Sequence, residues 1–200
     1  MAYPDRETAL QLLTWAYAQN PGPWLQHSKN VARAAEAIAN ACGLNADKAY
    51  VLGLLHDIGR YEGVRGLHHV CAGHELMLEK GYPDAARICL SHSFPIKDIA
   101  SFNGKPDCSQ DEVMKLQANL NALQYDAYDR LIQLCDALAT ADGIVTIQQR
   151  LIDVAIRNGV GEHYRQKWDA FLDIKHEFDR LCGCNIYTLF RQEIENSIFE

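Results

Sequence analysis

A histidine and an aspartate stand side by side directly after a strongly apolar segment of this 200-residue chain. That segment, residues 50–55, carries no charge, which is typical of a helix buried on nearly all sides. His56 and Asp57 are therefore expected in the interior, where an unpaired carboxylate is costly. A metal cation neutralises such a carboxylate, and imidazole with carboxylate is a common ligand set. The alternative is a structural pair, in which the aspartate at the helix end bonds the histidine.

Three further polar side chains fall on otherwise apolar helical faces. His27 precedes Val31 by four residues, and His92 follows Cys89 by three, so both imidazoles are expected to point inward. Asp136 lies on the apolar face of its own segment, where a carboxylate needs a partner. Each of them alone is explained by a hydrogen-bonded core histidine or by an aspartate that caps a neighbouring helix. Together with the His-Asp pair, His27 and Asp136 predict a metal site where three helices of a bundle meet.

Helical patterns, separated by Gly, Pro and Asn, cover most of the chain, and strand patterns are scarce. We therefore predict an all-α, single-domain helical bundle of roughly nine to ten helices over residues 1–200. The expected helices cover residues 4–20, 24–42, 45–57, 69–80, 82–93, 110–123, 126–140, 147–157, 162–181 and 187–195. The irregular segment 94–109 is long enough to act as a flap.

The composition fits a soluble globular protein, with 48% hydrophobic and 22% charged residues. The net charge of −7 argues against broad nucleic-acid or anionic-membrane binding. No apolar run approaches the roughly 20 residues of a membrane span, and the N-terminal residues lack a signal-peptide pattern. The seven cysteines form no paired CxxC motif, so we expect a cytoplasmic protein without a thiolate-rich structural zinc site.

Taken in order, the inward histidine, the His-Asp pair and the distant inward aspartate resemble the HD superfamily of metal-dependent phosphohydrolases. The segment Leu-Leu-His-Asp-Ile-Gly-Arg over residues 54–60 is close to the signature of that family. The resemblance covers roughly residues 24–140, and residues 141–200 are expected to form a helical C-terminal extension packed on this HD-type domain. It implies an all-helical fold, a buried divalent-metal centre and hydrolysis of phosphate esters, often of nucleotides.

Many members of the HD superfamily add two histidines after the His-Asp pair and hold two metals. His69, four residues before a glycine at a helix start, resembles the first of these, and His92 resembles the second. The resemblance then implies two metals bridged by Asp57, on the ligand set His27, His56, Asp57, His69, His92 and Asp136. His68 and His74 compete for the place of His69, although His74 also suits a packed core position.

The resemblance also implies that metal-bound water or hydroxide attacks a phosphomonoester or phosphodiester of a small substrate, with nucleotides among the candidates. One or two divalent ions are expected, and the ligands do not distinguish Fe, Mn, Zn, Co and Ni, with Mg as a further candidate. Asp57 and Arg60 are the expected catalytic residues, and Arg60 stands where the family often has a lysine. Arg60, Arg65 and Lys97 are the phosphate-binding candidates, although Arg65 and Lys97 also suit solvated surface positions.

Two other functions stay open at this point. Some relatives with the same six ligands are di-iron oxygenases, which iron content and O₂ consumption would separate from a hydrolase. A non-catalytic, metal-stabilised module that binds a nucleotide or a protein partner is the third hypothesis. The aromatic face of the segment 162–181 leaves room for a homodimer, although packing on the core is the preferred explanation.

Overall fold

The computed structural model describes residues 1–64, 66–104 and 106–199. Over these ranges the chain folds into ten α-helices and three short 3-10 helices, without a β-strand. The prediction of an all-α fold with nine to ten helices is therefore confirmed. Arg65, one of the expected phosphate-binding residues, lies outside the described residues.

The α-helices differ in length from nine to nineteen residues. They are α1 (Arg6–Gln19), α2 (Trp24–Cys42), α3 (Ala46–Leu55), α4 (His68–Glu79), α5 (Pro83–Ser91), α6 (Gln110–Ala122), α7 (Ala127–Asp136), α8 (Ile147–Asn158), α9 (Tyr164–Cys182) and α10 (Arg191–Phe199). The 3-10 helices are η1 (Ile58–Glu62), η2 (Ile99–Ser101) and η3 (Ile186–Phe190).

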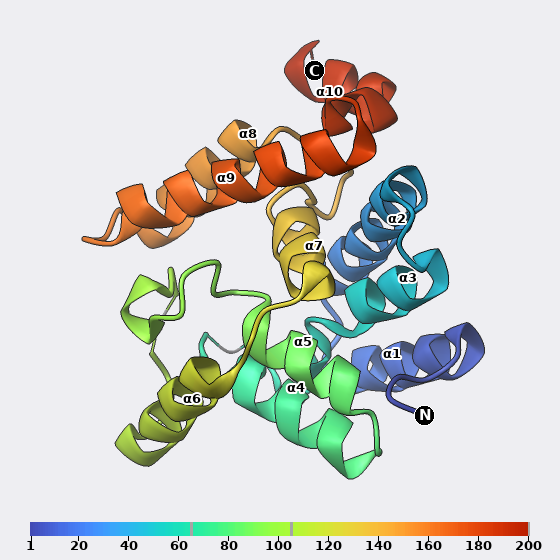
Figure 1. Cartoon of the computed structure of the whole chain (residues 1–200). Coiled ribbons are helices and arrows are strands. Elements are labelled where there is room, and N and C mark those ends of the chain that lie inside the picture. Colours follow the sequence, from blue (N-terminus) through green and yellow to red (C-terminus); the bar gives the residue numbers. More distant parts are fainter. Residues whose placement is uncertain (65, 105, 200) are drawn as a thin grey trace.

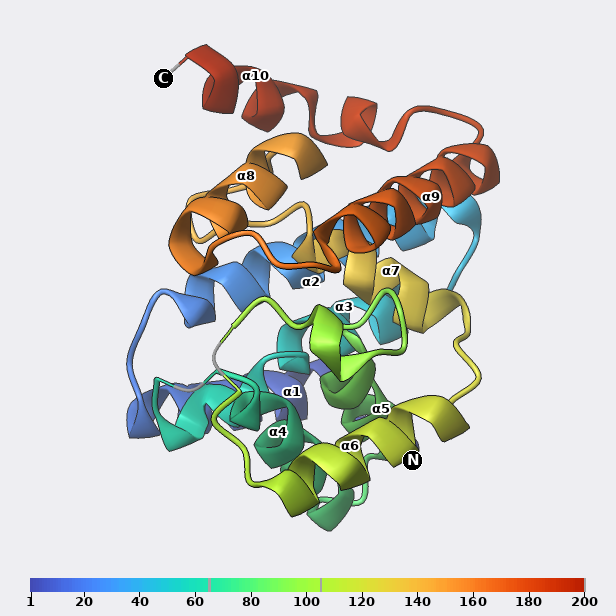
Figure 2. The ribbon, with the colours of Figure 1, turned by 90° about the vertical axis from the view of Figure 1, so that its left-hand side faces the viewer.

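The helices form three layers (Figure 1 and Figure 2). The central layer contains α2, α3 and α7, which pack on one another. On one side lie α1, α4, α5 and α6, and on the other lie α8, α9 and α10. The main apolar core fills the space between these layers, and a smaller apolar cluster lies between α4, α5 and α6. The two termini lie in opposite outer layers.

Local signals set the end of α2 and the start of α3 where the sequence predicts them. α2 stops before Gly43, whose φ of 75° lies in the left-handed region that favours glycine. α3 begins after Asn45, whose side-chain oxygen accepts a hydrogen bond from the backbone N–H of Lys48. These two helices carry or immediately precede three of the predicted ligands, so their ends fix where those side chains emerge.

Two predicted helices differ from those observed by more than two residues at an end. The helix expected over 126–140 ends at Asp136, because the chain then makes a tight turn in which Ala139 pairs with Ile144. The helix expected over 187–195 is divided into η3 and α10. The first difference affects the site, since it places Asp136 at the end of α7 rather than in its interior.

Two glycines allow the elements that carry predicted ligands to approach closely. A Cβ atom at Gly59 would lie 2.0 Å from the carbonyl oxygen of His69, and a Cβ atom at Gly53 would lie 2.8 Å from the Cα atom of Ala32. A larger residue would force the backbones apart at either place. Glycine therefore lets η1 pack directly on α4, and α3 pack directly on α2.

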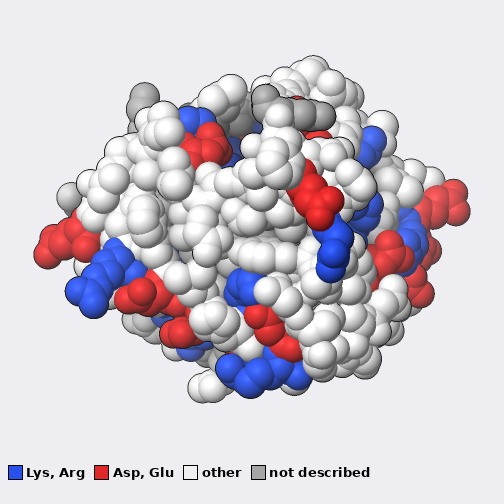
Figure 3. Space-filling view, turned by 90° about the horizontal axis from the view of Figure 1, so that it is seen from above, with Lys and Arg blue, Asp and Glu red and all other residues white. Residues whose placement is uncertain are grey.

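In the part of the chain that the structure describes, no helix is both long enough and apolar enough to cross a membrane. The face seen in Figure 3 carries Lys and Arg side chains mixed with Asp and Glu side chains, not gathered by sign. Charges of opposite sign thus offset one another on this face.

Candidate metal centre

The structure brings together all six predicted metal ligands. They are His27 in the first turn of α2, His56 and Asp57 directly after α3, His69 in the first turn of α4, His92 directly after α5, and Asp136 at the end of α7. Five of these side chains are buried, and that of Asp136 keeps 24% exposure. Helix ends from five helices therefore converge on one small polar volume inside an apolar bundle.

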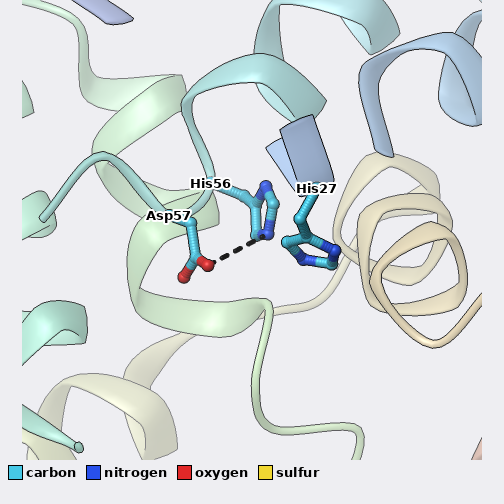
Figure 4. Close-up of side chains that lie close together, drawn as sticks. All are labelled: His27, His56 and Asp57. Atoms are coloured by element: carbon cyan, nitrogen blue, oxygen red, sulfur yellow. Dashed lines mark ion pairs between the residues drawn. The ribbon is translucent and has the colours of Figure 1, made fainter. Parts of the chain in front are cut away.

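A first group of ligand atoms belongs to His27, His56 and Asp57, and these atoms lie within 4.8 Å of one another. Figure 4 shows the two imidazole rings side by side, with the carboxylate aimed at His56. The distance from His56 Nε2 to Asp57 Oδ2 is 3.8 Å. Asp136 closes the group, because its Oδ1 atom lies 3.0 Å from His27 Nε2 and 3.9 Å from His56 Nε2.

Asp57, His69 and His92 form a second group with ligand atoms equally close together. Asp57 Oδ1 lies 3.1 Å from His69 Nε2 and 3.5 Å from His92 Nε2. The two Nε2 atoms are 3.3 Å apart. Asp57 thus belongs to both groups, and a carboxylate in this position can contribute one oxygen to each of two cations.

Backbone carbonyls orient three of the imidazole rings. The Nδ1–H group of His56 donates to the carbonyl oxygen three residues earlier in the chain, at 2.7 Å. His69 and His92 contact the carbonyl oxygens three residues before them through Nδ1 in the same way. A carbonyl oxygen only accepts, so Nδ1 carries the proton and Nε2 presents a lone pair to the cluster.

The polar atoms at the centre fit a cation. Two Nε2 lone pairs, on His69 and His92, face each other at 3.3 Å and repel unless a proton or a cation lies between them. Asp57 Oδ1 is buried and has no hydrogen bond of good geometry. Leaving such an atom unsatisfied is costly, and a divalent cation with nitrogen and oxygen ligands satisfies it.

Burial keeps the central histidines in the neutral form that binds metals. It lowers the pKa of His56 to about 4, although the charges of Asp57 and Asp136 act in the opposite direction. Burial also lowers the pKa of His69, and the nearby charge of Arg60 adds to this effect. His56 and His69 therefore offer neutral imidazole nitrogens at ordinary pH.

The two carboxylates remain ionised despite their surroundings. Burial opposes the ionisation of Asp57, but Arg60 and the neighbouring histidines hold its pKa well below the usual value. Arg60 Nε donates to Asp57 Oδ2 at 2.5 Å, which also fixes the direction of the carboxylate. Burial opposes the ionisation of Asp136 as well, but a hydrogen bond and the charge of His27 lower its pKa.

The chain matches a family model described as the HD domain over residues 24–141. This match covers more than half of the 200 residues and includes all six candidate ligands. The chain belongs to the HD domain family. A comparison with the solved structures gives no match. The HD domain implies a superfamily of metal-dependent phosphohydrolases, and the buried His and Asp groups are compatible with metal binding.

A cleft of about 820 Å³ opens onto the candidate ligands of the HD domain. Five of the six ligands border it, together with Arg60 and the aromatic side chains of Trp24 and Phe102. Part of its wall comes from beyond the residues matched by the family, because Lys167 and Phe171 of α9 also border it. The C-terminal helices therefore help to enclose the site that the HD domain provides.

Three other candidates from the sequence, Lys97, His68 and His74, lie outside this cleft. Lys97 donates to the carbonyl oxygen of Leu123 and lies 5.0 Å from the ring centre of Tyr125, so its assignment to the site is corrected. His74 contacts a backbone carbonyl oxygen of α5 at 2.9 Å, as a packed histidine does. His68 faces two glutamates outside the cleft. Of the three competing histidines, only His69 lies among the six candidate ligands, which we call the HD cluster.

Sequence reasoning missed Lys167, which is 5% exposed and borders the cleft. Its Nζ atom donates to the carbonyl oxygen of Ser101 at 3.1 Å, and no carboxylate of the described residues forms an ion pair with it. The sequence does contain a signal for Lys167, because this charged residue lies four residues before Phe171 on the apolar face of its helix. A charged residue on an apolar helical face is also the pattern that predicts Asp136.

Proposed function

We propose that this chain is a metal-dependent phosphohydrolase that acts on a small phosphorylated substrate. The observation that carries the proposal is the position of Asp57, shared by two groups of ligand atoms at the base of a cleft. His27, His56, Asp57 and Asp136 would hold one divalent ion, and Asp57, His69 and His92 would hold a second. Such ions supply Lewis acidity toward phosphoryl oxygens and lower the pKa of water.

Arg60 acts first as a positioning residue in this proposal. Its bond to Asp57 Oδ2 holds the shared carboxylate in place and keeps it ionised. Arg60 also borders the cleft, so its positive charge lies near any phosphate that reaches the ligands. A planar guanidinium suits both contacts, since it offers several N–H donors in fixed directions.

Lys167 is the side chain best suited to bind a phosphate of the substrate. Its ammonium group has three donors, of which the contact with Ser101 uses one. A buried charge without an ion-pair partner is costly, and an anion in the cleft would offset that cost. Arg150 and Arg157 also border the cleft, but both donate to Asp153, which offsets their charge.

The cleft suits a substrate of roughly nucleotide size. Its volume of about 820 Å³ falls within the range of small-molecule sites, about 300–1,000 Å³. Trp24 and Phe102 give the wall aromatic surface against which a base or another flat group could pack. Nucleotides are therefore the substrates to test first.

Phosphate release is the measurement that tests this proposal. The chelator-treated chain is reloaded in turn with Mn²⁺, Fe²⁺, Co²⁺, Ni²⁺, Zn²⁺ and Mg²⁺, and assayed with p-nitrophenyl phosphate, its diester and a set of nucleotides. We expect metal-dependent release of phosphate or nitrophenol that Asp57→Ala abolishes. Asp169→Ala serves as the matched control, because that aspartate is exposed on α9, with 66% of its side chain accessible.

Oxygen consumption is recorded in the same assays, because the di-iron oxygenase alternative has the same ligands. Uptake of O₂ with no release from any ester would refute the hydrolase proposal. Metal binding without turnover on the whole panel would refute it too, and would favour the non-catalytic hypothesis. Activity that survives Asp57→Ala would show that the shared carboxylate is not the centre of the reaction.

A further inference from the structure

A second group of metal-binding side chains lies outside the HD cluster, where α4 meets the start of α6. Ligand atoms of His68, Cys108 and Glu112 lie within 4.8 Å of one another. The thiols of Cys71 and Cys108 are close enough for each to shift the pKa of the other. All four side chains are partly exposed, so ions in solution can reach them.

Both ring nitrogens of His68 face a carboxylate. Nε2 lies 2.8 Å from Glu62 Oε2, and Nδ1 lies 3.3 Å from Glu112 Oε1. A neutral imidazole carries one N–H, so it can donate to only one of these oxygens. A cation bound at Nδ1 and Glu112 Oε1 satisfies the other contact, while Nε2–H donates to Glu62. Histidines that bind metals commonly donate their second N–H to a carboxylate in this way.

Local structure brings the ligand residues of each segment together. His68 and Cys71 are three residues apart on α4 and share one face of it, whereas Cys108 lies in the bend before the N-cap Ser109 and Glu112 lies in the first turn of α6. One imidazole, two thiols and one carboxylate are a ligand set that zinc accepts in tetrahedral sites. The two pairs are separated by about forty residues of chain, which explains why the sequence shows no compact cysteine motif.

We propose that His68, Cys71, Cys108 and Glu112 bind a thiophilic divalent cation, with Zn²⁺ as the expected ion. The site joins α4 to the segment 94–109, whose residues Phe102 to Gly104 border the catalytic cleft. Asp107 already ties the two parts together, because its carboxylate accepts from the backbone N–H groups of Gly66 and His68. A bound ion would strengthen this connection and hold one wall of the cleft against the helix that carries His69.

Cobalt substitution tests the site on the full, reduced chain. Co²⁺ is titrated into chelator-treated protein while the near-ultraviolet absorption is recorded, because thiolate bound to Co²⁺ gives a charge-transfer band that nitrogen and oxygen ligands do not give. The ligand groups of the buried HD cluster contain no thiol among the described residues. We expect a thiolate band whose final intensity corresponds to one bound Co²⁺ per chain, that Zn²⁺ bleaches and that Asp57→Ala retains.

Variants separate this site from other cysteines. Replacing both thiols with serine (Cys71→Ser with Cys108→Ser) should remove the band, and Cys184→Ser, which changes a cysteine just beyond the end of α9, should leave it intact. Glu112→Gln should keep the cap of α6, since glutamine also serves in a capping box. It should nevertheless weaken Zn²⁺ binding by roughly 10-fold or more, since losses of outer-shell partners alone cost about 10–100-fold.

The absence of a thiolate band from the reduced wild-type chain would overturn the proposal, as would a band that persists when Cys71 and Cys108 are both replaced by serine. Zinc content measured by mass spectrometry gives a second readout that does not depend on colour. It should fall by one equivalent in His68→Ala while the Asp57-dependent ions remain. Equal zinc content in His68→Ala and the wild type would also overturn the proposal.

Discussion

At the scale of single residues, the group that Nδ1 contacts distinguishes the histidines of the cluster from the histidine that lies outside it. His56, His69 and His92 each use Nδ1 on the carbonyl oxygen three residues earlier, which turns Nε2 toward Asp57. His74 uses Nδ1 on a carbonyl oxygen of another helix and has no role in the cluster. This distinction depends on how a helix end or loop bends, so the sequence could not choose between His68, His69 and His74.

The buried histidines predict a pH dependence of the stability of the metal-free chain. The pKa of His56 is about 4 in the folded chain, and its reference value, taken for the unfolded chain, is 6.5. Above pH 6.5 it is neutral in both states. Between pH 6.5 and 4 the unfolded chain binds a proton that the folded chain excludes, so this residue lowers the free energy of unfolding by up to about 3 kcal/mol. His69, whose pKa is also lowered by burial, acts in the same direction.

Urea denaturation of the metal-free chain at pH 7, 6 and 5 measures this effect. His56→Gln should show a smaller loss of stability over the same range. His176→Ala, which changes an exposed histidine of α9, should behave as the wild type does. The lowered pKa values of Asp57 and Asp136 give stability that is lost as the pH falls below 3.8, so acid continues to destabilise the fold. Equal stability at pH 7 and 5 would contradict the prediction.

Lys167→Met tests the assignment of Lys167 to substrate binding. A hydrogen bond to a charged group contributes about 1.5–3 kcal/mol, so KM for a phosphorylated substrate should rise roughly 10-fold or more. Lys175→Met is the matched control, because Lys175 is a buried lysine of the same helix that pairs with Asp179 at 2.6 Å. The control should lower the melting temperature without raising KM. An unchanged KM in Lys167→Met would show that Lys167 does not bind substrate and serves only its contact with Ser101.

At the scale of elements, the close approach of η1 to α4 sets the distance between Asp57 and His69. A Cβ atom at Gly59 would meet the His69 carbonyl oxygen at 2.0 Å, so Gly59→Ala must move one backbone. We expect a loss of about 3 kcal/mol in stability from overpacking, together with weaker metal binding. Calorimetric melting and metal titration measure the two effects.

Gly161→Ala provides the comparison for this substitution. A Cβ atom there would lie 3.6 Å from the Tyr164 ring, which is ordinary contact. We expect this variant to bind metal as the wild type does and to keep its stability within about 0.5 kcal/mol. If Gly59→Ala also retained full metal affinity, the spacing of η1 and α4 would not control the centre.

Elements were predictable from the sequence where a local signal ends them. Gly43 and Asn45 mark the end of α2 and the start of α3 by backbone conformation and side-chain capping, which neighbouring residues decide. The end of α7 at Asp136 depends instead on a turn closed by pairing of Ala139 with Ile144. No residue there breaks a helix by itself, so the sequence predicted too long a helix.

At the scale of the whole molecule, metal binding should stabilise the fold, because the six candidate ligands come from five helices in two layers. A ligand at 100 times its dissociation constant contributes about 2.7 kcal/mol, which corresponds to roughly 5–10 °C in melting temperature for a chain of this size. Scanning calorimetry with and without saturating Mn²⁺ measures the shift. In Asp57→Ala the rise in melting temperature should be small. A rise equal to that of the wild type would show that the ion binds elsewhere.

The overall architecture was within reach of the sequence because apolar periodicity and the inward polar residues agree with one another. His27, His56, Asp57 and Asp136 stood out as polar groups on apolar faces, and the structure gathers them. Lys97 was a plausible basic residue in a flanking loop, yet the fold turns it toward Leu123. Loop conformation depends on tertiary packing, which the spacing of residues does not encode.

The cleft has two sources, because the candidate ligands lie within residues 24–141, and Lys167, Phe171 and the residues of α8 that border it come later in the chain. Under the proposed function, the residues of the reaction and part of the residues that contact the substrate therefore lie in different parts of the chain. Exchange of the last helices alone would then change the molecule that the cleft accepts and leave the inner ligands in place.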